Sequence, residues 1–289
     1  MKQVVVFIFM AVWGNDALSQ PYVDPVQVRY TYAFTAKQKN RATPFTHLWA
    51  GSDLPIKINK SYLLLSPYFE NWQFDSALVL QDGLLPVVKN LTGVKGLVMP
   101  VGLMMPLNNP KWSLAINAMI RTNGEQLFAD KTYQIGGAGF LSYEKSKGQK
   151  LRLGAYINGD FFGLFVMPLL GADWRMDEKN YFFGLLPGRF TWEHKFGKSI
   201  YGGITFRALT NSYRLQAGSF LRLDDNQLSA FIDLYPSKNI CFTVEPGYGI
   251  MRKFRTGYEK RKYDSYKDWG DGPFIKVSAA YRIRLEEKK

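Results

Sequence analysis

The sequence contains very little of the two residue types that build most metal and redox sites. Its 289 residues include one cysteine, Cys241, and two histidines, His47 and His194. A single cysteine excludes a disulfide framework and a cysteine-rich zinc or iron–sulfur site. Two histidines leave little material for a histidine metal cluster. We therefore expect no cofactor.

The chain also lacks a long apolar run beyond its N-terminus. A transmembrane helix needs about 18 or more consecutive apolar residues. The longest charge-free stretch, Gly96 to Pro110, is interrupted by prolines, which break helices. The next candidate, Phe161 to Ala172, is too short. The sequence therefore predicts that no helix of the mature chain spans a membrane.

The first 19 residues have the three parts of a secretory signal peptide in the right order. Lys2 is a short positive region, Val4 to Trp13 is apolar, and Ala17-Leu18-Ser19 is a small-x-small cleavage site. Cleavage there makes Gln20 the new N-terminus. The sequence thus predicts a signal peptide at 1–19 and one exported domain at 20–289.

What is present is apolar, aromatic and basic. Hydrophobic residues make up 46% of the chain and aromatic residues 16%, which excludes a disordered protein. Basic residues exceed acidic ones by 13. This charge would suit nucleic-acid binding, but an exported domain has no access to nucleic acid. We expect no nucleic-acid partner.

Apolar and polar residues alternate along most of the chain with a period of two, which only a β-strand produces. In the last segment Ile275, Val277 and Tyr281 lie on one face, and Lys276 and Arg282 lie on the other. Several segments run ten residues or longer, which is typical of tilted strands that span a membrane. The same alternation recurs at residues 26–35, 151–158, 182–196 and 240–250.

Turn residues separate these segments, and we count about 12 strands, within a range of 10–14. A sheet edge left unpaired in lipid costs several kcal/mol per backbone group, so the strands at Val26–Thr35 and Phe274–Leu285 are expected to pair. The predicted fold is all-β, a closed antiparallel transmembrane β-barrel. Ser76 to Leu91 could form a short helix or a plug.

A secreted β-sandwich or a soluble barrel would also alternate. Long strands, charged opposite faces and aromatic residues near strand ends favour the membrane barrel, because such rings form its interfacial girdles. One strand is exceptional, since Phe161 to Trp174 is apolar on both faces until Asp173. The candidate girdle residues are Trp112, Trp174, Tyr181, Trp192, Tyr201 and Tyr281.

The cleavage site before Gln20, the Tyr- and Lys-rich strands and the final Ala279-Ala280-Tyr281-Arg282-Ile283-Arg284-Leu285 resemble uncharacterised outer-membrane β-barrel proteins of the Bacteroidota. Many of these are assigned to domains of unknown function. The resemblance implies the fold and a location in the cell outer membrane, without an activity. It departs at the tail Glu286–Lys289, because outer-membrane chains usually end at an aromatic residue.

No catalytic constellation is visible. Outer-membrane lipid hydrolases use a Ser activated by His, typically as His-x-Ser, and neither His47 nor His194 has a Ser two positions on. Glu193 and Glu245 share the inner face by parity and could form a glycosidase-like pair, but such pairs more often neutralise arginines. Cys241 carries no mark of activation. We expect no enzyme activity.

The inner faces are rich in basic residues. A positive lumen raises the local concentration of anions and biases a pore toward them. Alternatively, the arginines pair across a filled lumen and nothing permeates. The candidate lumen-lining residues are Arg121, Arg152, Arg189, Glu193, Arg207, Asp233, Glu245, Lys276, Arg282 and Arg284.

The longest charged loop is expected at Met251–Gly272, before the last strand. With both termini in the periplasm, this loop is extracellular. Its basic and aromatic residues could hold lipopolysaccharide phosphates by charge-assisted hydrogen bonds, or the loop could be solvated without a partner. The candidate lipopolysaccharide contacts are Arg255, Lys260, Arg261, Lys262 and Trp269.

These features predict a monomeric outer-membrane β-barrel, whose leading interpretation is a narrow pore for passive transport of small, anionic-leaning solutes. The alternative is a closed-lumen structural or accessory barrel that binds envelope partners or lipopolysaccharide. A lipid-modifying enzyme is third. The expected partners are outer-membrane lipid, lipopolysaccharide and, during biogenesis, the barrel-assembly machinery. An open, filled or sideways-opening lumen would separate these interpretations.

Overall fold

The computed structural model of the chain describes residues 21–34, 44–82, 85–215, 219–259, 262–265 and 270–285. The signal peptide predicted at residues 1–19 lies outside these ranges. Within them, no helix is long and apolar enough to cross a membrane.

The described part consists of strands joined by turns. They are β1 (Tyr22–Phe34), β2 (Pro44–Gly51), β3 (Leu54–Ile58), β4 (Ser61–Leu65), β5 (Tyr68–Asp82), β6 (Leu85–Pro106), β7 (Trp112–Gly124), β8 (Tyr133–Ser146), β9 (Gln149–Asp160), β10 (Gly163–Arg175), β11 (Asn180–Leu186), β12 (Arg189–Lys195), β13 (Ile200–Arg214), β14 (Phe220–Leu234), β15 (Ile240–Glu259), β16 (Lys262–Ser265) and β17 (Gly272–Arg284).

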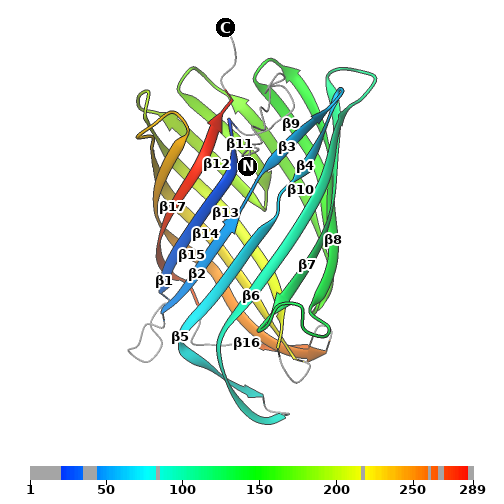
Figure 1. Cartoon of the computed structure of the whole chain (residues 1–289), viewed down its shortest axis with the longest axis vertical. Helices are drawn as coiled ribbons and strands as arrows, with labels where there is room; N and C mark the ends of the chain where they lie inside the picture. The colour runs from blue at the N-terminus through cyan, green and yellow to red at the C-terminus, as the bar shows by residue number, and fades with distance from the viewer. Residues whose placement is uncertain are drawn as a thin grey trace, which may run out of the picture.

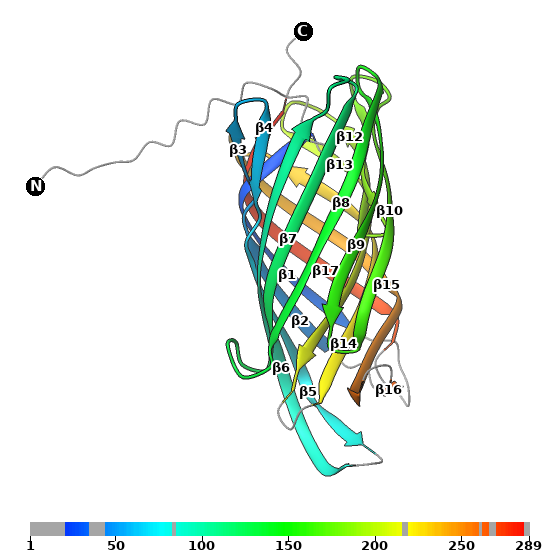
Figure 2. The same cartoon turned by 90° about the vertical axis from the view of Figure 1, so that its right-hand side faces the viewer.

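The strands form one closed antiparallel barrel (Figures 1 and 2). The terminal strands pair with each other, from Tyr22 opposite Arg284 to Ala33 opposite Phe274. This confirms the predicted all-β barrel and its closure by the first and last strands. We call the end with Tyr22 and Arg284 the near end, and the opposite end the far end.

The wall has 14 strands rather than about 12. β2 and β3 are two parts of one wall strand, β4 and β5 are two parts of the next, and β16 is a short addition to β15. The sequence-based count is too low partly because 182–196 was treated as one strand. Pro187-Gly188 turns the chain there, and β11 and β12 are separate strands.

Alternation sorts side chains between lipid and interior. The wall is one sheet thick, so an outward side chain has no protein above it. On β17, Val277 is 46% exposed, whereas Lys276 and Arg282 are 4% and 3% exposed. Exposed apolar side chains surround the barrel as a belt, which is the pattern of a membrane-spanning barrel. They include Val28, Met99, Val101, Ile116, Ile120, Ile135, Leu153, Ile157, Leu164, Val166, Ile204, Ile232, Val244 and Ile275.

Two segments differ from their sequence-based descriptions. The described residues of the segment Ser76 to Leu91 do not form a helix or a plug: they belong to the paired strands β5 and β6, with Leu78 opposite Leu91 and Asp82 opposite Leu85. Figure 1 shows these paired strands projecting beyond the far end. Met251–Gly272 is not a loop throughout, because β15 continues to Glu259 and pairs with β16.

Candidate functional site

The barrel interior is the candidate functional site, and its near end holds a network of buried ion pairs. Arg282 Nε donates to Asp24 Oδ1 at 2.6 Å, and its NH1 donates to Asp233 Oδ2 at 2.6 Å. Its guanidinium also lies 3.8 Å from the centre of the Tyr22 ring. Three strands, β17, β1 and β14, are thus held together by one cation.

Two further arginines are held in the same region. Arg284 NH2 donates to Glu193 on β12, and the guanidinium lies 3.6 Å from the centre of the Tyr201 ring. Arg189 NH2 donates to the Tyr22 hydroxyl at 2.9 Å. Tyr201, expected in an outer aromatic girdle, is instead buried inside at 5% exposure. Tyr201 lies near a strand end, but it shares the inward face of β13 with Thr205 and Arg207.

The middle of the barrel holds a second set of pairs. Lys276 Nζ donates to Glu245 Oε1 at 2.7 Å and to Gln227 Oε1 at 2.9 Å. On the other side Arg152 of β9 donates to Asp173 of β10. Arg207 is half-buried opposite Gln227, and its Nε has no hydrogen-bond partner among the described residues. Glu193 and Glu245 therefore bind different cations and do not form a carboxylate pair.

Several buried acids were missed in the sequence. Sequence alternation places Asp24 on the outer face with Val26, but a bulge between Val23 and Val26 reverses the parity and buries Asp24 at 6% exposure. Because acids accompany most interior cations, the excess of positive charge expected there is much smaller than the sequence indicated. The other missed interior acids are Glu70, Asp160, Asp173 and Asp225.

The far end is filled rather than open. An apolar core occupies the space between β1, β2, β5, β6, β13, β14, β15 and β17. β13 bends across to β7, where Arg214 pairs with Gly124 and the Glu125 N–H donates to the Arg214 carbonyl at 3.1 Å. The core residues are Ala33, Phe45, Trp72, Phe74, Leu91, Val94, Tyr213, Leu215, Leu221, Leu223, Phe254 and Phe274.

The crossing part of β13 binds the wall on both of its faces. Tyr213 donates its hydroxyl to Glu70 Oε1 at 2.7 Å on one side. Ser212 Oγ donates to Asp160 Oδ1 at 2.9 Å on the other. Arg121 of β7 joins the first side by donating to Asn211 Oδ1 at 3.2 Å. The end of β13 therefore runs through the barrel cross-section and not only along its wall.

The interior beside β7, β8, β9 and β10 is filled less completely. Many inward positions on these strands carry small or apolar side chains. These side chains remain half-exposed, although the far end of the barrel is closed. Because an inward side chain can be exposed only to space inside the barrel, part of this side is unfilled. The half-exposed inward residues are Asn117, Met119, Gly136, Ala138, Gly154, Tyr156, Phe165 and Met167.

The two histidines lie in different environments. His47 is buried, with Nε2 3.2 Å from Glu70 Oε2 and its ring stacked at 3.8 Å on Trp72. His194 lies on the outer face, and its Nδ1 is 2.9 Å from Asn180 Oδ1. The contacts described for the two rings include no serine or cysteine nucleophile. Within the described ranges, no three His, Cys, Asp or Glu side chains are grouped as metal ligands.

The candidate lipopolysaccharide contacts are only partly described. Arg255 binds Asp224 on β14, which Arg222 also binds at 3.0 Å, so Arg255 is part of a local ion-pair cluster. Lys262 begins β16. Lys260, Arg261 and Trp269 lie outside the described residues.

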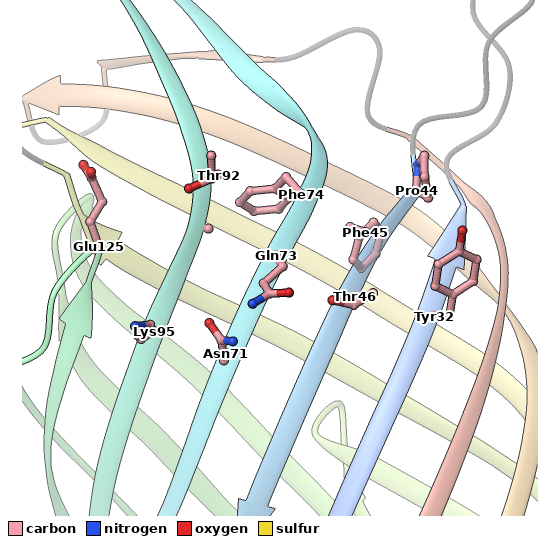
Figure 3. A pocket seen from close by; sticks show the side chains of 11 residues that line it. Tyr32, Pro44, Phe45, Thr46, Asn71, Gln73, Phe74, Thr92, Lys95 and Glu125 are labelled. Carbon is pink, nitrogen blue, oxygen red and sulfur yellow. The ribbon is translucent and has the colours of Figure 1, made fainter.

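A pocket of about 570 Å³ lies on the wall near the far end (Figure 3). Its polar residues Gln73 and Lys95 are exposed, and Tyr32 is 37% exposed, so it opens on the outer surface. Two of its lining residues, Phe45 and Phe74, also belong to the apolar core of the far end. The lining residues are Tyr32, Pro44, Phe45, Thr46, Asn71, Gln73, Phe74, Thr92, Gly93, Lys95 and Glu125.

No known protein family matches the chain, and no curated protein matches it. Among solved structures, it is similar to an outer membrane channel from Pseudomonas putida F1, with 7% identity and a TM-score of 0.45 over 94% of this chain and 100% of that chain. It is also similar to the P. putida toluene transporter TodX, with 8% identity and a TM-score of 0.37 over 94% and 92%. At these values the similarity carries no conclusion about function.

Proposed function

We propose that the protein is a monomeric outer-membrane channel that passes small solutes through its interior. The observation that carries the proposal is the unfilled side of the interior along β7–β10, where Ala138 and Met167 face inward and remain half-exposed. A scaffold has no need for such space, because close packing stabilises a barrel. The apolar belt supports insertion in a membrane, and the export signal predicted at 1–19 supports the outer membrane. We also propose, from the sequence resemblance, that the protein belongs with the outer-membrane barrel proteins of the Bacteroidota.

The charge pairing supports weak rather than strong anion preference. The expectation of an anionic preference rested on an excess of inner-face cations over acids. Three of these cations, Lys276, Arg282 and Arg284, each bind a carboxylate in the interior. A paired cation contributes little net potential at the distance of a passing ion. Arg29 and Arg207 remain half-buried, each with an Nε that lacks a hydrogen-bond partner among the described residues. They are the cations best placed to retain a slight preference.

The alternative, a closed accessory barrel, is favoured by the filled far end and the buried ion pairs. The two functions differ in one measurable respect, because only a channel transmits solutes. Solute uptake by cells with the protein in the outer membrane, and conductance of the purified protein in planar bilayers, test this directly. A wild-type protein that gives neither would leave the accessory function standing.

A matched pair of variants locates the path. Ala138→Trp places a large ring on the unfilled inner side of β8, and we expect it to reduce uptake and conductance. Ala155→Trp places the same ring on the exposed outer face of β9, where lipid accommodates it. We expect near wild-type transport from this control. Equal transport by the two variants would contradict a path along β7–β10.

A further inference from the structure

The hairpin of β11 and β12 is shorter than the strands on either side of it. β10 pairs with β11 only from Leu170 to Arg175, and β13 pairs with β12 only from Tyr201 to Arg207. Figure 1 shows this hairpin ending partway along the barrel. Toward the far end, the facing edges of β10 and β13 therefore have no strand between them. The barrel wall is interrupted there.

The size of the interruption follows from sheet geometry. Three inter-strand spacings separate β10 from β13 at the hairpin, which makes the break roughly 14 Å wide at that level. The unpaired edge of β10, Gly163–Leu169, makes it roughly 20 Å long. The break closes toward the far end, where the Phe161 N–H donates to Ser212 Oγ at 3.1 Å. The interruption is thus a tapered window bounded on all sides by described residues.

An unpaired strand edge facing lipid is costly, since lipid offers backbone groups no hydrogen-bond partner. Two features lower the cost here. Pro168, near the end of the β10 edge that meets the hairpin, has no N–H to leave unpaired. On the opposite edge the Ala208 N–H donates to the Gly188 carbonyl at 2.9 Å. The remaining cost indicates that the window is retained for function rather than for stability.

The edge of the window on β10 is apolar on both faces. Leu164 and Val166 face outward and are 67% and 56% exposed, whereas Phe165 and Met167 face inward and are half-exposed. The Phe165 ring lies 5.9 Å from the Phe162 ring and 6.1 Å from the Tyr156 ring, both measured between centroids. An apolar surface therefore continues from the lipid-facing side of the wall to the unfilled side of the interior.

The far end offers no comparable route among the described residues. The apolar core and the crossing of β13 to β7 fill the cross-section there. Solutes that enter along the barrel axis from that end would have to displace this core, whereas solutes that enter through the window reach the unfilled side directly.

We propose that the window between β10 and β13 is a lateral portal through which small apolar or amphipathic molecules pass between the membrane and the barrel interior. The proposal rests on the channel function proposed above and names its solute class and route.

The portal can be bridged chemically. Continuing the register of β10 to β13 through β11 and β12 places Pro168 across from Thr210, so Thr210 shares the outer face with Pro168 and Val166. In a Cys241→Ala background, Val166→Cys and Thr210→Cys are joined by a bifunctional maleimide. The control pair, Leu141→Cys and Leu153→Cys, places the same reagent on the outer face of the barrel, across adjacent strands that are already paired.

The readout is the initial rate at which Gram-negative cells that carry the protein take up N-phenylnaphthylamine, an apolar dye. We expect bridging of the portal pair to lower uptake to the level of cells without the protein, and bridging of the control pair to leave most of it. Uptake that persists after complete bridging, with conductance intact, overturns the portal but not the channel. A wild-type protein that gives neither dye uptake nor conductance overturns the channel.

Lipid access tests the portal independently of transport. A spin label at Met167→Cys is expected to be relaxed by membrane-dissolved oxygen nearly as strongly as a label at the outward Val166→Cys. The same label at Ala138→Cys, inward on a fully paired strand, is expected to be shielded. A Met167 label shielded as completely as the Ala138 label overturns the portal, whatever the uptake shows.

Discussion

Arg282 on the last strand donates two hydrogen bonds to Asp24 on the first strand, at 2.6 and 2.9 Å, across 258 positions of sequence. The two strands are already joined by backbone pairing, so this pair reinforces the seam at which the barrel closes. Both side chains are buried, and Asp233 accepts a third bond from the same guanidinium. The near end of the barrel is therefore stabilised at its seam by a cation shared between two acids.

Removing one partner of this pair should weaken the seam. Arg282→Gln leaves Asp24 and Asp233 buried without their cation, and we expect a loss of roughly 3–5 kcal/mol in the free energy of unfolding. Urea titration of the refolded barrel, followed by its gel mobility without heating, measures this. The double variant Arg282→Gln with Asp24→Asn should recover part of the loss. A single variant as stable as the wild type would show that the pair does not hold the seam.

The lipid-facing side of β17 should reject charge according to depth. Val277 lies in the middle of the strand and is 46% exposed, so Val277→Arg should cost roughly 2–4 kcal/mol. Ile283→Arg, near the end of the strand, should cost about 0–1 kcal/mol. The measurement is folded yield in vesicles and unfolding in urea. Equal costs at the two positions would contradict the assigned membrane depth.

Releasing an interior cation should change ion selectivity. Glu193 neutralises Arg284, so Glu193→Gln leaves an unmatched positive charge inside the barrel. Reversal potentials in a salt gradient should then shift toward anion preference. The shift should be larger in dilute salt, because the Debye length grows from about 8 Å to about 30 Å. Glu178→Gln, in the exposed turn between β10 and β11, is the control and should shift little.

Lipopolysaccharide binding by the β15–β16 region stays a prediction. Replacing Lys260, Arg261 and Lys262 together by Gln should weaken binding of purified lipopolysaccharide, and more strongly at low salt. The matched control replaces exposed lysines in turns of the near end, which faces the other membrane surface: Lys111, Lys198 and Lys238. If both triple variants lose binding equally, the effect is one of net charge and the site is not at β15–β16.

Sequence alternation alone was enough to predict which side chains of β17 face lipid and which face the interior. It also predicted that the terminal strands pair, because an open edge in lipid is too costly. Alternation failed at Asp24, where a bulge reverses parity, and at Pro187-Gly188, where a tight turn was read as part of one strand. Both failures are local changes in backbone geometry that leave the average pattern intact.

One signal of the window was present in the sequence. The segment from Phe161 to Trp174 is apolar on both faces, unlike the other strands, and in the structure its first half is the unpaired edge of β10. The composition alone does not indicate a break in the wall, because the break depends on how short β11 and β12 are.

The sequence by itself determined that this chain forms β-strands with one apolar face, because alternation with a period of two is a property of each strand and needs no partner. Long strands with aromatic ends then favoured a membrane barrel. Only the tertiary structure decided the number of wall strands, the partners of the interior charges, the filling of the far end and the break between β10 and β13. These depend on register and on contacts such as Arg282 with Asp24 or Tyr213 with Glu70, which join positions far apart in the chain. The local sequence pattern does not show which distant residues come into contact. The interior could therefore be predicted to contain charged side chains, but the ion pairs between them could not be predicted.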